Sequence, residues 1–222
     1  MAFLKKYRIF LITMGIFSVV FLTVAYNLLK TDKKLPVFNP VDVNPELADP
    51  SVWHVGRDHR IADFSFVNQD GKTVTQKDYE GKIYVADFFF TTCQTICPIM
   101  TSHMEKVQDA IRHDPNVMIL SHSVTPDIDT PEVLKAYAQK HHVDARKWNL
   151  VTGDKRKIFE IARRSYLAVK TGSEAEMYDM VHTENFVLVD RERRIRGFYD
   201  GTKESEIKRL IDDIRFLSES SE

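Results

Sequence analysis

The distribution of hydrophobic residues separates an apolar N-terminal segment from a longer region of short strand-like and helix-like runs. Residues 9–29 read IFLITMGIFSVVFLTVAYNLL and contain no charged side chain. A helix of this length rises about 31 Å, which matches the hydrocarbon core of a bilayer, about 30 Å thick. Signal peptides have shorter apolar regions, about 7–15 residues, and no small-residue cleavage motif follows this one. The pattern predicts a short stub at residues 1–8 and a transmembrane anchor at 9–29.

The segment after this anchor has no hydrophobic period and is rich in proline. Residues 30–59 contain four prolines, each of which fixes φ and removes a backbone donor. Such a composition favours an extended, semi-rigid conformation. We therefore predict a tether over residues 30–59 and a single folded domain over residues 60–222.

The domain region alternates strand-like and helix-like patterns. Residues 82–90, KIYVADFFF, form a nearly continuous apolar run that is typical of a strand buried on both faces. A hairpin is expected around Asp70-Gly71. Other strands are predicted at residues 117–124, 148–151, 185–189 and 195–199. Helices are predicted to begin near Pro98, Thr130, Asp154 and Thr202. Residues 166–181 are expected to form a long loop. This order of elements predicts an α/β fold.

The balance of charge excludes one class of function. The sequence has 31 basic and 32 acidic residues, and its formal net charge is −1. Nucleic-acid binding usually requires a basic face or stripe. We therefore expect no nucleic-acid partner.

Cys93 and Cys97 are the only cysteines in the sequence, and they follow the buried strand directly. A disulfide between them would close a very small loop and would stabilise the fold little. Pro98 marks the first turn of the next helix, where free N–H groups and the helix dipole favour thiolates over thiols. Two thiolates at this spacing can share a soft ion such as Cu(I), or they can form a disulfide. Two unreactive buried thiols are the remaining alternative.

Cysteines at the junction of a central strand and its helix are typical of the thioredoxin fold, and the predicted order of elements resembles it. Asp87 lies six residues before Cys93, within the apolar strand, and thioredoxins carry an aspartate at the same offset. A buried carboxylate at this position would accept or relay protons for the thiols. The alternative is that Asp87 lies at a sheet edge and pairs with a lysine or arginine.

The segment around the cysteines is similar to a known family motif. Residues 87–98 read DFFFTTCQTICP and resemble the core motif of the Sco/SenC family. These proteins are membrane-anchored copper chaperones with a thioredoxin fold, and they serve the assembly of cytochrome c oxidase. Gly81-Lys82, residues 123–130 (SVTPDIDT) and Val181-His182-Thr183 also resemble segments of the family pattern. The resemblance covers about residues 60–217.

The resemblance implies a metal site made of three side chains. Cys93 and Cys97 would supply thiolates and His182 an imidazole to one copper ion per chain, as Cu(I) or Cu(II), and this donor set suits copper. Two positions depart from the family pattern. Thr125 replaces one aspartate, and Val181 replaces the aspartate beside the histidine. We therefore expect either an altered copper affinity or a shift of the balance towards thiol chemistry.

Two activities follow from the resemblance. In the first, a membrane-anchored chaperone delivers copper to the dinuclear copper site of cytochrome c oxidase, in subunit II. In the second, a thiol-disulfide oxidoreductase reduces the cysteines of that site or of another exported copper or thiol protein, with Cys93 attacking and Cys97 resolving. The sequence leaves open whether the protein is an enzyme. A peroxiredoxin-like peroxidase is disfavoured, because the motif context of that family is absent around the cysteines.

The N-terminus bears on location. No transit-peptide pattern precedes the predicted anchor. We therefore expect a bacterial inner-membrane protein. The thiol and copper chemistry of the site favours a domain on the periplasmic side.

Overall fold

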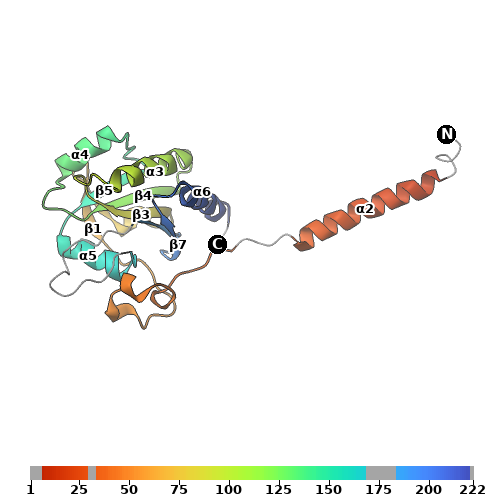
Figure 1. The fold of residues 1–222 in the computed structure, drawn as a ribbon, viewed down its shortest axis with the longest axis horizontal. Helices are drawn as coiled ribbons and strands as arrows, with labels where there is room; N and C mark the ends of the chain where they lie inside the picture. The colour runs from red at the N-terminus through yellow and green to blue at the C-terminus, as the bar shows by residue number, and fades with distance from the viewer. Residues whose placement is uncertain (1–6, 30–33, 169–183, 221–222) are drawn as a thin grey trace. The chain divides into compact units, whose positions relative to one another are not determined.

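The computed structural model describes residues 7–29, 34–168 and 184–220 and divides the chain into two compact units (Figure 1). The first unit, Met1–Lys34, contains the helix α2 (Arg8–Leu29). The apolar window Arg8–Ala25 of this helix is long enough to cross a membrane, and none of it is buried inside the protein. α2 is therefore a candidate membrane span, and it coincides with the predicted anchor.

The second unit, Leu35–Glu222, is built on a seven-stranded mixed sheet. Its strands, in chain order, are β1 (Ser65–Asn68), β2 (Thr73–Thr75), β3 (Ile83–Phe89), β4 (Val117–Ser123), β5 (Trp148–Thr152), β6 (Asn185–Val189) and β7 (Ile195–Asp200). They lie side by side in the order β2-β1-β5-β4-β3-β6-β7. The central strands β3, β4 and β5 are parallel, and the outer pairings are antiparallel. The parallel pairs require crossover connections, which helices supply.

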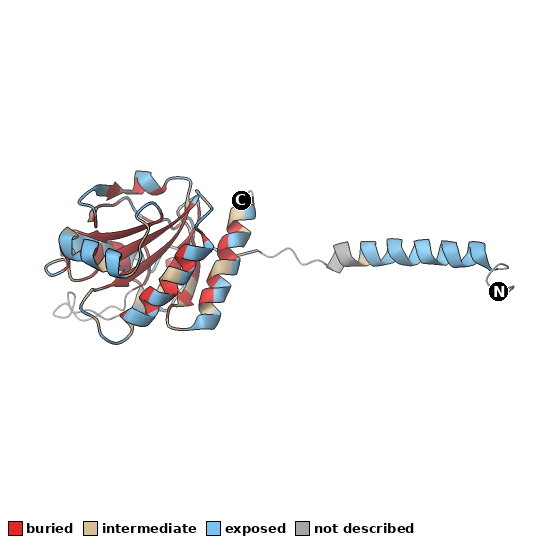
Figure 2. Cartoon of the chain, turned by 90° about the horizontal axis from the view of Figure 1, so that it is seen from above, coloured by how far each residue is buried: buried red, intermediate tan, exposed pale blue. Residues whose placement is uncertain are grey.

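Helices cover both faces of the sheet (Figure 1). One face packs against α3 (Cys97–Ala110), α4 (Pro131–Lys140) and α6 (Glu204–Glu219), and the other packs against α5 (Lys155–Arg164). Because side chains of a strand alternate between faces, Val85 and Phe89 of β3 contact the α3 layer, whereas Tyr84 and Phe88 contact the α5 layer. β3 and β4 are buried along their whole length, as the red sheet in Figure 2 shows.

The hydrophobic pattern predicts most of these elements correctly. The hairpin turns at Asp70-Gly71, where Gly71 has a φ of 71° that favours glycine. The expected cap of α4 is present, because the Thr130 hydroxyl accepts the N–H of Val133. In the first turn of α4, Val133 is 37% exposed, whereas Leu134 is fully buried. Adjacent residues of a helix point about 100° apart, so only one of this pair faces the sheet.

The predicted tether over residues 30–59 is wrong in its later part. The globular unit begins at Leu35 rather than at residue 60. Phe38 forms an isolated β-bridge with Ile195, and the guanidinium of Arg196 donates to the carbonyl oxygen of Leu35 at 2.8 Å. These contacts hold the start of the unit on β7.

The prolines of this segment begin turns instead of extending the chain. Three of them open short 3-10 helices: η1 (Pro40–Asp42), η2 (Pro45–Leu47) and η3 (Pro50–Val52). An asparagine or aspartate precedes each proline, and the side chains of Asn44 and Asp49 accept N–H groups of the first turn. The fixed φ of proline suits the first turn of a helix when such a capping residue precedes it. The segment therefore folds onto the domain.

His122 of β4 is an uncharged residue of the core. Its ring stacks on Phe88 with ring centroids 4.9 Å apart, and Phe66 and Tyr166 lie edge-on to it. Neither ring nitrogen has a hydrogen-bond partner of good geometry among the described residues. Burial lowers the pKa of His122 to about 3, and the nearby backbone of Asp87 opposes this shift only weakly. The imidazole is therefore neutral in the folded protein.

Replacing His122 by leucine is expected to reduce the sensitivity of the fold to acid. The unfolded histidine binds a proton below about pH 6.5, whereas the folded one does not until about pH 3, so stability falls as the pH drops through this window. At pH 5, the loss amounts to about 2 kcal/mol of unfolding free energy. Urea unfolding at pH 7 and pH 5 measures it, with the exposed His113→Leu as control. Equal pH dependence in His122→Leu and wild type would contradict this assignment.

Candidate metal and thiol site

The end of β3 and the start of α3 bring the two cysteines together. β3 stops at Phe89, and the backbone then turns so that the N–H of Cys93 donates to the carbonyl of Phe90 at 3.3 Å. α3 begins at Cys97, with Pro98 in its first turn. The N–H of Cys97 donates to the Cys93 sulfur at 3.4 Å. Cys93 thus occupies the entrance of the helix, where unpaired N–H groups favour an anion.

The two thiols differ in exposure and in acidity. Cys93 is half-buried, whereas Cys97 is 2% exposed, and both are free. Partial burial raises the pKa of Cys93, but hydrogen bonds from Cys97 and Thr95 outweigh this effect and bring the pKa down to about 7. Burial, together with the hydrogen bond to Cys93, raises the pKa of Cys97 to about 12. The expectation of two acidic thiols is therefore right for Cys93 and wrong for Cys97.

Asp87 lies in the middle of the sheet, below α3. It faces Ser121 across the β3–β4 pair, and the Ser121 hydroxyl donates to its carboxylate. The indole N–H of Trp148 in turn donates to Ser121 at 2.8 Å. Burial raises the pKa of Asp87 to about 7, and the bond from Ser121 offsets only part of this rise. The alternative of an edge residue is wrong, because β3 lies between β4 and β6.

A second loop packs against the one that carries Cys93. It follows β4, and the N–H of Val124 donates to the carbonyl of Phe89 at 2.9 Å. Within it, Asp129 is fully buried and accepts hydrogen bonds from Thr91. The Thr125 hydroxyl also donates to Asp129, at 2.9 Å. Thr125, which the sequence presents only as a missing carboxylate, therefore has a structural role that no local pattern reveals.

The third expected ligand, His182, lies outside the described residues, as does Val181. Within the described ranges, no group of three histidine, cysteine, aspartate or glutamate side chains is arranged to hold a metal ion. The structure therefore brings Cys93 and Cys97 together and does not place the histidine. It does show that β6, which starts at Asn185, runs antiparallel to β3 with Ala86 opposite Val187.

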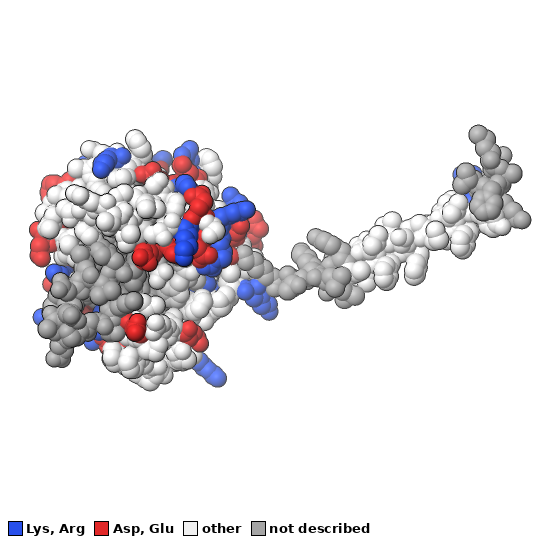
Figure 3. Space-filling model, in the orientation of Figure 1, with Lys and Arg blue, Asp and Glu red and all other residues white. Residues whose placement is uncertain are grey.

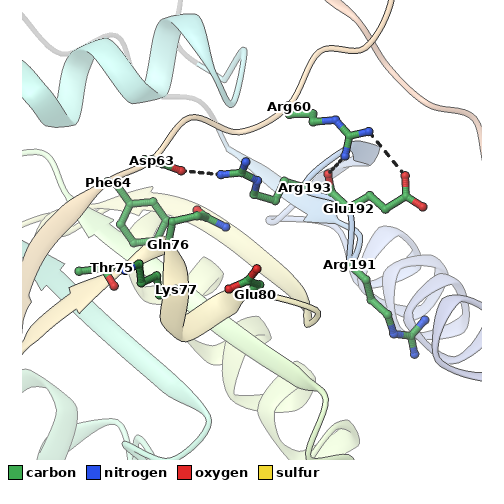
Figure 4. Close-up of a pocket in the computed structure, with 10 residues that line it drawn as sticks. All are labelled: Arg60, Asp63, Phe64, Thr75, Gln76, Lys77, Glu80, Arg191, Glu192 and Arg193. Atoms are coloured by element: carbon green, nitrogen blue, oxygen red, sulfur yellow. Dashed lines mark hydrogen bonds and ion pairs between the residues drawn. The ribbon is translucent and has the colours of Figure 1, made fainter.

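A separate groove lies at the other end of β3 (Figure 4). It is lined by side chains from the segment before β1, from the turn before β3 and from the β6–β7 turn. Two ion pairs lie among its lining residues, since Arg193 bonds Asp63 and Arg60 lies 3.7 Å from Glu192. Figure 3 shows basic and acidic side chains beside one another on the face that it draws. The thiols, rather than this groove, carry the reactive chemistry.

Comparison with known proteins assigns a family to this arrangement. The model of the SCO1/SenC family matches residues 54–218. The chain belongs to the SCO1/SenC family. Expectations of the family and of a thioredoxin-like α/β fold are therefore confirmed.

Three solved Sco structures are similar to this one. A SCO1/SenC family lipoprotein from Bacillus anthracis is 36% identical, with a TM-score of 0.64 over 72% of this chain and 96% of that one. BsSco, described as a cytochrome c oxidase assembly protein with a disulfide switch, is 32% identical, with a TM-score of 0.63 over 72% and 94%. ScoI from Arabidopsis thaliana, solved with copper bound, is 28% identical, with a TM-score of 0.56 over 69% and 97%.

Replacing Asp87 by asparagine is expected to stabilise the metal-free protein at alkaline pH. An unfolded aspartate ionises near pH 4, but the folded one holds its proton until about pH 7, so its stabilising contribution is lost as the pH rises through this range. The gain in unfolding free energy of Asp87→Asn over wild type should be about 2–4 kcal/mol larger at pH 8 than at pH 4. Denaturation at both pH values measures it, and the exposed Asp127→Asn should show no such change. A gain independent of pH would contradict the buried, protonated state.

Proposed function

We propose that this protein is a membrane-anchored copper chaperone that delivers copper to the dinuclear copper site of cytochrome c oxidase, in subunit II. One observation carries the proposal: two free thiols, one half-buried and one buried, adjoin where β3 leads into α3, in a member of a family with copper-bound structures. Thiolates are soft ligands that select Cu(I).

We assign Cys93, Cys97 and His182 as the ligands of one copper ion. Cys93 is ready to bind, because its pKa of about 7 leaves much of it as thiolate at neutral pH. Cys97 loses its proton on binding, since metal ligation deprotonates a thiol. His182 precedes β6 closely, and the antiparallel register carries the start of β6 to the same end of the sheet as Phe89. This direction supports the assignment of the histidine.

The asymmetry of the thiols suits the transfer of a metal ion. A half-buried Cys93 is accessible to an incoming thiolate of a partner, whereas Cys97 is screened by α3. Asp87, whose pKa is raised to about 7 by burial, is suited to exchange a proton as Cys97 gains or loses the metal. Ligand exchange of this kind passes the ion from chain to chain without free copper.

The N-terminal helix supports a membrane location for this function. α2 would anchor the protein in a bacterial inner membrane, with the globular unit on the periplasmic side. Copper would there be loaded and released at the membrane surface, where the partner oxidase resides.

The purified full-length chain in detergent should bind one copper ion. Single substitutions Cys93→Ala, Cys97→Ala and His182→Ala should each abolish stoichiometric binding, because each removes one of three donors. Metal analysis after loading and desalting measures the ratio of copper to protein. The exposed His113→Ala serves as control and should bind as wild type does. Undiminished binding by His182→Ala would overturn the three-ligand site.

A second function is favoured by the difference between the two thiol pKa values. Cys93, with a pKa of about 7, has the properties of an attacking thiolate, and the buried Cys97, with a pKa of about 12, those of a resolving thiol. The disulfide switch described for BsSco points in the same direction. In this reading the protein reduces partner cysteines so that they can accept copper.

Metal-free protein distinguishes the two functions. A reductase should turn over a disulfide substrate repeatedly when an external dithiol regenerates the reduced protein. Cys93→Ser should abolish this turnover, whereas Cys97→Ser should trap a mixed disulfide. Rates of substrate reduction, with His182→Ala as a control that retains both thiols, measure this activity. Absence of turnover in metal-free wild type excludes the reductase and leaves the copper chaperone.

A further inference from the structure

Asp129 is a fully buried carboxylate whose hydrogen-bond donors are hydroxyls and one backbone N–H. Thr91 donates through its hydroxyl at 2.5 Å and its N–H at 3.3 Å. The hydroxyls of Ser123 and Thr125 donate at 2.5 and 2.9 Å. Three of these donors reach Oδ2 and the Thr91 hydroxyl reaches Oδ1, so both oxygens of the buried carboxylate are hydrogen-bonded. The cluster of Asp129, Thr91, Ser123 and Thr125 is hereafter called the hydroxyl clamp.

The hydroxyl clamp joins the two loops at the thiol end of the sheet. Thr91 belongs to the turn in which Cys93 donates its N–H to Phe90. Ser123 ends β4, directly opposite Phe89 in the parallel register. Asp129 closes its own loop as well, because its N–H donates to the carbonyl of Thr125 at 2.9 Å. The turn that carries Cys93 is thus fastened to β4 through a single buried carboxylate.

The two cysteines differ in which part of the structure holds them in place. Cys97 is the first residue of α3 and is held by the packing of that helix on the sheet. Cys93 lies in the loop before the helix, and its sulfur accepts the N–H of Cys97 at 3.4 Å. A buried carboxylate that loses a donor pays a desolvation cost, so the clamp resists partial opening.

We propose that Asp129 is a positioning residue for Cys93: through Thr91 it fixes the turn that presents the Cys93 sulfur to the start of α3. Thr125 completes the clamp in this chain, at the position where the family pattern has aspartate. A hydroxyl there donates to Asp129, which an ionised carboxylate cannot do. The proposal rests on the proposed function only in taking Cys93 as the reactive ligand thiol.

Selective alkylation of metal-free, reduced, full-length protein in detergent tests the proposal. Iodoacetamide labelling at pH 7, followed by mass spectrometry of the Cys93 and Cys97 peptides, gives a rate for each thiol. Thr91→Val should slow the labelling of Cys93 about fivefold, because a sulfur displaced from the helix start is less often a thiolate. Thr91→Ser retains the hydroxyl and should restore the rate to within about twofold of wild type.

Further variants separate positioning from general destabilisation. Thr125→Val should slow Cys93 labelling in the same direction as Thr91→Val, while Asp127→Asn, an exposed carboxylate in the same loop, should leave it unchanged. Asp129→Asn is expected to give the largest effect; if it fails to fold, the two threonine variants decide. An unchanged Cys93 labelling rate in folded Thr91→Val and Thr125→Val would overturn the proposal. So would a Cys93 labelling rate in Thr91→Ser that is as slow as in Thr91→Val.

A copper measurement keeps the two proposals distinguishable. Loaded Thr91→Val should shift the thiolate-to-copper absorption band relative to wild type, whereas Asp127→Asn should not. If wild type binds no copper, the proposed function fails, yet the labelling rates still test the positioning role. If wild type binds copper and the labelling rates of the clamp variants are unchanged, only the positioning role fails.

Discussion

The parallel pairing of β3 with β4 is the constraint on which the rest of the structure depends. The two strands run in register from Ile83 and Val117 to Phe89 and Ser123, and every residue of both is buried. Polar groups in such a pair must find partners inside the protein. Asp87 meets Ser121, and the ends of both strands finish together at the loops of the site. Thus the site is fixed to the most deeply buried part of the domain.

The two thiols of the site built on this strand pair lie in different electrostatic surroundings. Their different acidities follow from this difference. One sulfur receives N–H groups at the open end of a helix, while the other is desolvated beneath it. Two buried carboxylates of the same region have different surroundings. Asp87 has one hydroxyl donor and a raised pKa, whereas Asp129 has a full set of donors. Similar side chains therefore perform different tasks, because their hydrogen-bond partners differ.

Much of the fold was predictable from local patterns, and the errors have physical causes. Apolar runs located the central strands, and caps such as Thr130 located the helices. The composition of the proline-rich segment predicts a tether, and this is wrong because the contacts of the segment with Ile195 and Arg196 come from residues far along the chain. The acidity of Cys97 was misjudged for a similar reason: the helix start is local, but burial is not.

By itself, the sequence determined the order of strands and helices, the candidate membrane span and the two thiols at a strand–helix junction, since these depend on periodicity and neighbouring residues. Only the tertiary structure decided which thiol is acidic, why the pKa of Asp87 is raised to about 7 and what Thr125 does. Each of these depends on desolvation and on donors brought together across loops. A linear pattern records which residues are present, and packing decides which of them lose water and which gain a partner.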